Sequence, residues 1–123
     1  MIVAGCDVGS VSGKTVILQD GKIVSSSVVP CEPLSDITAT KSLEKALEGT
    51  GISQADIRCV IGTGYGRIDV PFAKKVVTEI ACHGKGAHWA NNGSRTVIDV
   101  GGQDAKVIKV DADGVVKDFV LND

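Results

Sequence analysis

Short β-branched runs separated by glycine-rich turns make up most of the chain, and two segments with helical spacing interrupt them. Alternating apolar residues predict strands over 2–8, 15–18 and 22–29, and Asp20-Gly21 is a two-residue hairpin signal between the last two strands. Residues 35–47 carry apolar side chains at helical spacing, and glycines end that pattern. A buried strand over 57–61 follows. The first half therefore predicts three antiparallel strands, a helix and a further strand.

The second half continues the mixture of strands and helices. The run K-V-V-T-E-I predicts a strand over 75–80 because its residues are β-branched, and a helix is expected over 81–91. Strands over 96–100, 105–110 and 115–120 follow, with a turn at 111–114 between the last two. Three successive hairpin strands followed by alternating strands and helices favour an α/β domain with a mixed sheet.

Composition excludes several classes of protein. The chain has 123 residues, 43% of them hydrophobic and 23% charged, which is typical of a globular domain. A net charge of −2 and 3% aromatic residues give neither a basic face nor a stacking platform for nucleic acid. The N-terminus lacks a basic signal-peptide region, and no apolar run approaches the length of a membrane span, so we expect a cytoplasmic protein.

An internal repeat is the most informative feature of the sequence. Asp7-Val8-Gly9 recurs 92 residues later as Asp99-Val100-Gly101, and Lys14 recurs at the same offset as Lys106. A D-G turn follows each copy. The repeat predicts a duplicated lobe, with a first lobe over 1–93 and the start of a second over 94–123.

Each D-V-G turn offers the chemistry of a phosphate site. It places a carboxylate at a strand end beside glycine N–H groups that phosphate oxygens can approach closely. Ser10 and Ser12 add hydroxyl donors, and Lys14 adds a mobile positive charge. Asp7 and Asp99 would repel phosphate unless Mg²⁺ or its waters lay between them. The sequence therefore predicts a magnesium polyphosphate site.

The stretch from Gly9 to Thr15 also looks like a P-loop. A P-loop has four residues between its glycines, whereas three separate Gly9 from Gly13. A P-loop also runs into a helix, but Thr15 here opens a predicted strand. Both differences argue against a P-loop.

Four motifs together resemble one protein family. They are G-C-D-V-G-S-V-S-G-K-T-V-I-L at 5–18, G-T-G-Y-G-R at 62–67, T-E-I-A-C-H-G-K-G-A at 78–87 and V-I-D-V-G-G-Q-D-A-K at 97–106. In this order they resemble the ATP-hydrolysing activators of 2-hydroxyacyl-CoA dehydratases and benzoyl-CoA reductases, which belong to the superfamily of acetate and sugar kinases, heat-shock chaperones and actin. The resemblance implies an α/β fold, with an actin-like (ribonuclease H-like) lobe whose mixed sheet has the order βββαβαβα, plus the opening strands of a second, duplicated lobe.

The resemblance also implies roles for individual residues. It implies that ATP or ADP binds at the two turns and that Asp7 and Asp99 hold Mg²⁺ directly or through water. It also implies that Glu79, which is expected at the end of a strand, positions the attacking water. The catalytic set is Asp7, Glu79 and Asp99. The nucleotide-binding set is Gly9, Ser10, Ser12, Lys14, Gly101, Gly102, Gln103 and Lys106.

In that family the activator is a homodimer that shares one [4Fe–4S] cluster and passes an electron to its dehydratase or benzoyl-CoA reductase partner. The cluster cysteines are expected after residue 123, so Cys6, Cys31, Cys59 and Cys82 are predicted to be free thiols. On this interpretation the chain is the N-terminal portion of an activator. Cys82 and His83 are expected only to pack at a surface or a lobe interface.

Two other functions stay open at this stage. One is a small-molecule kinase of the same superfamily, such as an amino-sugar kinase, with Asp69 or Asp104 as its base. The other is a non-catalytic regulatory or interaction fragment that retains the fold. For the last three strands we expect an uncovered apolar face built from Val97, Val107 and Val116, through which the chain dimerises or aggregates.

Overall fold

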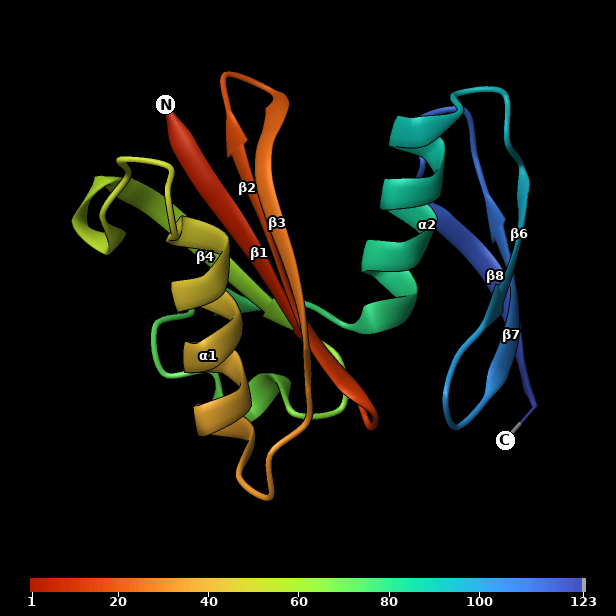
Figure 1. Cartoon of the computed structure of the whole chain (residues 1–123). Helices are drawn as coiled ribbons and strands as arrows, with labels where there is room; N and C mark the ends of the chain where they lie inside the picture. The colour runs from red at the N-terminus through yellow and green to blue at the C-terminus, as the bar shows by residue number, and fades with distance from the viewer. Residues whose placement is uncertain (123) are drawn as a thin grey trace. The chain divides into compact units, whose positions relative to one another are not determined.

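The computed structural model describes residues 1–122 and forms two compact units, Met1–Val77 and Thr78–Asp123 (Figure 1). Asp123 itself lies outside the described residues. The compact units divide sixteen residues before the predicted lobe boundary at 93/94, because the helix α2 (Glu79–Ala90) packs on the strands that follow it. The assignment of 1–93 and 94–123 to two duplicated lobes stays a prediction.

The first unit is built on a five-stranded mixed sheet, as predicted. Its strands are β1 (Ile2–Val8), β2 (Ser12–Gln19), β3 (Lys22–Pro30), β4 (Ile57–Thr63) and β5 (Lys75–Val76), in the spatial order β3-β2-β1-β4-β5. The first three are antiparallel, while β4 is parallel to both β1 and β5. The hairpin between β2 and β3 turns at Asp20 and Gly21, both with positive φ, as the D-G signal predicts.

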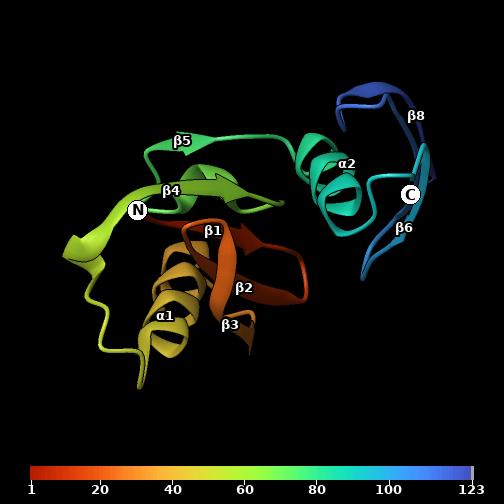
Figure 2. The ribbon, with the colours of Figure 1, turned by 90° about the horizontal axis from the view of Figure 1, so that it is seen from above.

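The helix α1 (Ser35–Leu47) lies along one face of this sheet (Figure 2). Its small side chains allow close approach, and a Cβ on Gly13 would lie only 2.5 Å from Thr38 Cγ2. Thr15 and Ser42 join β2 to α1 through hydroxyl groups 2.7 Å apart. The core between them contains Ala4, Cys6, Val8, Ile17, Ala39, Ala46, Val60 and Val70.

The segment between β4 and α2 differs from the sequence expectation. The strand predicted over 75–80 is wrong beyond Val76, because α2 already begins at Glu79. Thr78 is the N-cap residue, and its hydroxyl accepts a hydrogen bond from the Ala81 amide at 3.4 Å. The local β preference of the run gives way to tertiary context, because α2 packs on β6, β7 and β8. Between β4 and β5 the chain forms a single-turn 3₁₀ helix, η2 (Arg67–Asp69), where the actin-like order implied an α-helix; a second such turn, η1 (Gln54–Asp56), precedes β4.

The second unit is an antiparallel sheet of β6 (Thr96–Val100), β7 (Ala105–Val110) and β8 (Val116–Asn122), with α2 on one face. Gly84 is the point of closest approach, since a Cβ there would lie 2.8 Å from Val116 Cγ2 and 3.0 Å from Val110 Cγ1. Next to Gly84 in the helix, the Lys85 ammonium donates to the Asp113 carbonyl at 2.7 Å. The expectation that no helix covers these strands is therefore wrong.

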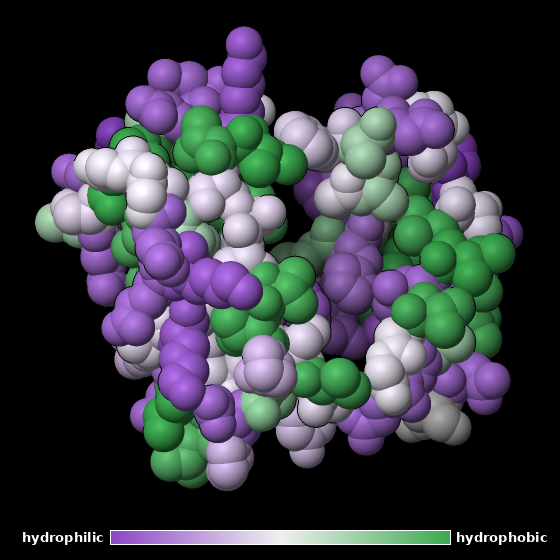
Figure 3. Space-filling view, viewed as in Figure 1, coloured by the Kyte–Doolittle hydropathy of each residue, from purple (hydrophilic) through white to green (hydrophobic). Residues whose placement is uncertain are grey.

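The other face of this second sheet is apolar and open. Strand register places Ile98, Val107 and Val120 in one row across β6, β7 and β8, and these side chains are 74%, 39% and 67% exposed. Green side chains gather over these strands in Figure 3. Of the three valines predicted on the uncovered face, only Val107 lies there, since Val97 and Val116 are half-buried on the face that α2 covers. We call the row of Ile98, Val107 and Val120 the outer row.

Two glycines of α2 give a matched test of how closely the helix packs. We expect Gly84→Ala to destabilise the second unit by about 1–3 kcal/mol, because its methyl group would overlap two valines of the sheet. Gly86→Ala meets no atom within 4 Å and should stabilise the helix by about 0.5–1 kcal/mol. Trp89, the only tryptophan, reports the urea unfolding of this unit by fluorescence. Equal effects of the two substitutions would contradict the packing described.

The outer row gives a second prediction. We expect the chain to self-associate through the outer row, because contiguous exposed apolar side chains favour association. Val107→Lys should shift the species seen by sedimentation velocity toward the monomer. Ile23→Lys, a matched change at a 53% exposed isoleucine of β3, should leave the distribution unchanged. A wild-type chain that stays monomeric at every accessible concentration would disprove the association.

Candidate functional site: two D-V-G hairpins

The first D-V-G turn connects β1 to β2. The Gly9 amide donates to the Ser12 carbonyl at 3.0 Å and closes the turn, so that Asp7 and Lys14 lie opposite each other in the antiparallel pair. Lys14 Nζ lies 3.6 Å from Asp7 Oδ2 and donates to the Ser12 carbonyl at 3.2 Å. Its side chain is 37% exposed, so the ammonium keeps access to an outside ligand.

The end of β4 packs tightly beside this turn. Thr63 pairs with Asp7 in the parallel register, and the Gly66 amide donates to the Val8 carbonyl at 2.9 Å. Gly64 has a φ of +89°, and a Cβ there would lie 2.2 Å from Asp7 Oδ1. Gly64 is therefore required by the close approach of this loop to Asp7, whereas a Cβ on Gly66 would meet Ser35 and the Val8 side chain at 2.6–2.8 Å.

Two polar atoms at this strand edge have no protein partner. Asp7 Oδ1 and Thr63 Oγ1 are both buried, and no hydrogen-bond partner for either is found among residues 1–122. Buried polar atoms in native proteins almost always have a partner, whether protein, water or ligand. Both atoms therefore suit a polar ligand or water at this edge.

The second D-V-G turn repeats the first in detail. The Gly101 amide donates to the Asp104 carbonyl at 2.9 Å, and Asp99 lies opposite Lys106 in the β6–β7 pair. Gly101, Gly102 and Gln103 are all exposed in this turn. The repeat inferred from the sequence is thus also a repeat of backbone hydrogen bonding and strand register.

The surroundings of Lys106 differ from those of Lys14. The Lys106 side chain is 3% exposed, and its Nζ lies 2.8 Å from Glu79 Oε1, 3.1 Å from Asp99 Oδ2 and 2.8 Å from Asp104 Oδ1. Burial lowers the pKa of Lys106, but hydrogen bonds with the three carboxylates outweigh it and raise the pKa well above its usual range. Lys106 is therefore a permanently charged, buried ammonium.

Glu79 and His83 reach this cluster from the same face of α2. Glu79 is the first residue of the helix rather than the end of a strand, and the interval of four residues places His83 one turn further along. His83 Nδ1 lies 3.2 Å from Asp99 Oδ2, so the expectation of mere surface packing missed a contact with the second turn. In the sequence, the four-residue spacing of Glu79 and His83 could have indicated that both side chains lie on one face of a helix.

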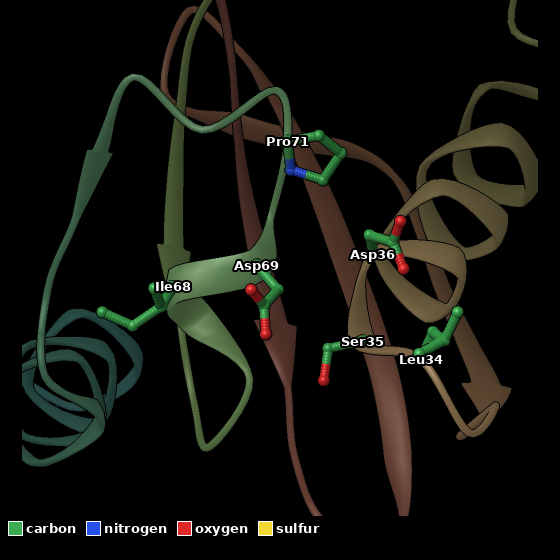
Figure 4. A pocket seen from close by; sticks show the side chains of 6 residues that line it. All are labelled: Leu34, Ser35, Asp36, Ile68, Asp69 and Pro71. Atoms are coloured by element: carbon green, nitrogen blue, oxygen red, sulfur yellow. The ribbon is translucent and has the colours of Figure 1, made fainter.

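The residues considered for a P-loop and for a kinase base lie in other surroundings. Lys14 and Thr15 lie within β2 and are not followed by a helix, which excludes a P-loop. Asp104, considered as a kinase base, is bound to Lys106. Asp69 lines a hollow of about 450 Å³ in the first unit, together with Leu34, Ser35, Asp36, Ile68 and Pro71 (Figure 4).

The four cysteines are free thiols. Cys6 is buried, and its pKa is raised by burial. Cys31 Sγ donates to the Gly9 carbonyl at 3.1 Å. No set of three or more His, Cys, Asp or Glu side chains within residues 1–122 is arranged to hold a metal ion.

Comparison with known proteins identifies the family. The sequence model of the BadF/BadG/BcrA/BcrD ATPase family matches residues 4–123. The chain belongs to this family. It is 42% identical over its whole length to the activator of lactoyl-CoA dehydratase from Anaerotignum propionicum, of which it covers 48%.

Two solved structures are similar in fold and sequence. One is the activator of 2-hydroxyisocaproyl-CoA dehydratase from Clostridium difficile with bound ADPNP, at 40% identity and a TM-score of 0.92. The other is component A of the (R)-2-hydroxyglutaryl-CoA dehydratase from Acidaminococcus fermentans, at 37% identity and a TM-score of 0.93. The chain is covered completely in both and spans 46% and 48% of them, so the α/β fold is confirmed and the chain spans about half the length of these relatives. Within residues 1–122 no helix has the length and apolarity to cross a membrane.

Proposed function

We propose that this chain supplies phosphate-binding turns of a MgATP site in a cytoplasmic, ATP-hydrolysing activator. The activator couples hydrolysis to electron transfer to a 2-hydroxyacyl-CoA dehydratase or a benzoyl-CoA reductase. The observation that carries the proposal is the hairpin built twice, with Gly9 and Gly101 closing turns that hold an Asp opposite a Lys. Family membership, and the ADPNP bound to a similar activator, support the same ligand.

In this proposal the first turn binds phosphate through the Ser10 backbone N–H, the Ser10 and Ser12 hydroxyls and the Lys14 ammonium. In the second turn, Gly102 and Gln103 are exposed and offer their backbone N–H groups. The amides of Gly9 and Gly101 close the turns, and the missing Cβ of each glycine lets phosphate oxygens come close to the backbone there.

In each turn the aspartate is proposed to bind Mg²⁺, Asp7 in the first turn and Asp99 in the second. The unpartnered, buried Asp7 Oδ1 fits a magnesium ion that keeps several of its waters, and Asp99 contacts Lys106 through Oδ2. When bound, Mg²⁺ neutralises charge on the transferring phosphate. Glu79 contacts Lys106 through Oε1, and we assign its carboxylate the role of orienting the attacking water.

The parent protein is proposed to be a homodimer with a dehydratase or reductase as its partner. A [4Fe–4S] cluster is part of that proposal for the parent only, with its cysteine ligands expected after residue 123. Membership of an ATPase family, and relatives that activate dehydratases, favour this function over the kinase and over a non-catalytic fragment.

Nucleotide binding is the direct test of the proposal. Titration calorimetry of the chain with ADP should show binding that strengthens with Mg²⁺. Lys14→Met should weaken binding roughly tenfold or more, because a hydrogen bond to a charged group contributes about 1.5–3 kcal/mol. Lys22→Met, at an exposed lysine of the β2–β3 hairpin, is the control and should change nothing. Absence of Mg-dependent binding, both in the chain and in a longer protein that contains it, would refute the proposed site.

Glu79 is tested by turnover. In a protein that carries this chain together with the second half of its relatives, Glu79→Ala should reduce ATP hydrolysis on the order of 10²–10⁴-fold while nucleotide affinity changes little. Glu44→Ala, on the exposed side of α1, serves as the matched control. If ATP turnover is unchanged in Glu79→Ala, Glu79 has a structural role and does not orient the attacking water.

A further inference from the structure

Lys14 and Lys106 occupy equivalent positions but lie on differently covered faces. In the first unit α1 packs on the face of Gly13 and Thr15, so Lys14, between them in the strand, points to the opposite face. In the second unit α2 packs on the face that carries Lys106 and Ile108. The helix thus covers opposite faces of the repeated hairpin. This difference leaves Lys14 exposed and buries Lys106.

The contacts of Lys106 occupy the whole ammonium group. A lysine ammonium has three N–H donors, and three carboxylate oxygens lie within 3.1 Å of Lys106 Nζ. Phosphate could gain a donor only by displacing a carboxylate. It would also meet a group of three negative charges that a single positive charge does not neutralise. Both facts oppose the direct phosphate contact that the resemblance assigned to Lys106.

We propose that Lys106 is a positioning residue, which fastens the start of α2 to the second D-V-G turn by holding Glu79 and Asp99 together, and does not itself bind nucleotide phosphate. The proposal deepens the function proposed above and rests on it for its nucleotide readout. It gives Lys106 a part in placing both the proposed water-orienting carboxylate and a proposed magnesium-binding carboxylate.

The geometry supports a fastening role at this end of the helix. Glu79 is the first residue of α2, Asp99 is near the end of β6, and Asp104 lies just before β7, so one ammonium joins three separate segments. The C-terminal half of α2 is held separately, by Lys85 and His88 at the β7–β8 turn. Thr78 also stabilises the first turn of the helix, through its capping hydroxyl at 3.4 Å from the Ala81 amide and through its carbonyl, which accepts from the Cys82 amide at 3.1 Å.

Loss of the ammonium should separate these segments. Without Lys106, Glu79 and Asp99 would face each other and Asp104 as like charges in a half-buried setting. The first turn of α2 would then open more often, while the hydrogen bonds of Lys85 and His88 would still hold the C-terminal half of the helix.

Amide hydrogen exchange of the whole chain measures the fastening directly and without nucleotide. Lys106→Met should raise the exchange rates of the Cys82 and His83 amides about tenfold or more, and Glu79→Gln should raise the same rates. Lys106→Arg, which keeps the charge, should restore most of the protection. Lys109→Met is the control, because Lys109 is an exposed residue of the same strand opposite Asp118.

Nucleotide affinity separates positioning from phosphate binding. ADP affinity without Mg²⁺ should stay within about threefold in Lys106→Met, whereas Lys14→Met lowers it tenfold or more. The strengthening of ADP binding by Mg²⁺ should shrink in Lys106→Met, because Asp99 loses its fixed position.

The outcomes are distinct. If the amide exchange rates are unchanged in both Lys106→Met and Glu79→Gln, Lys106 does not fasten the helix. If Lys106→Met loses as much ADP affinity without Mg²⁺ as Lys14→Met does, Lys106 is a phosphate ligand. If Lys106→Met does not fold, Glu79→Gln and Lys106→Arg decide the question by the same exchange measurement. If neither the wild-type chain nor a longer protein that contains it binds ADP, the proposed function fails, while hydrogen exchange still decides the role of Lys106.

Discussion

A single backbone hydrogen bond, from a glycine amide to the carbonyl three residues later, sets the geometry of both candidate sites. Gly9 makes it to Ser12 and Gly101 makes it to Asp104, at 3.0 and 2.9 Å. This closure fixes the register of the following strand, so an aspartate and a lysine lie opposite each other in both hairpins. It also turns a glycine-rich stretch of backbone outward at a strand end. Every proposed phosphate contact depends on this geometry.

The two D-V-G hairpins share one backbone geometry but surround their lysines with different groups. Ser12 in the first hairpin corresponds to Asp104 in the second, and the covering helix lies on opposite faces of the two hairpins. As a result, one lysine keeps access to a ligand and the other is enclosed by carboxylates from three segments. The two lysines therefore differ in exposure and in bonding partners because their surroundings differ, although their positions in the repeat are the same.

Local signals in the sequence were enough to predict the hairpins and most strands. The D-G turn at Asp20-Gly21 and the alternating strands depend on neighbouring residues, and the repeated register follows from the shared motif. The start of α2 was not predicted, because the helix packs on strands that follow it in the sequence and the β-branched residues before it favour a strand locally. The contacts of Glu79 and His83 depend on how the helix packs on β6 and β7, which no local pattern contains.

The burial of Lys106 is better explained by the positions that it gives to carboxylate groups than by a contribution to the stability of the fold. Replacing a buried ion cluster with apolar side chains of similar volume is often neutral or stabilising, because removing charges from water has a large cost. The sheet already has an apolar contact with α2 at Gly84, Val110 and Val116, so packing alone does not require Lys106. What an apolar residue could not supply is a fixed position for carboxylate oxygens. Glu79 and Asp99 are the two carboxylates of the second unit to which catalytic roles are proposed, and one ammonium holds both. The cluster therefore makes physical sense as a device that orients them.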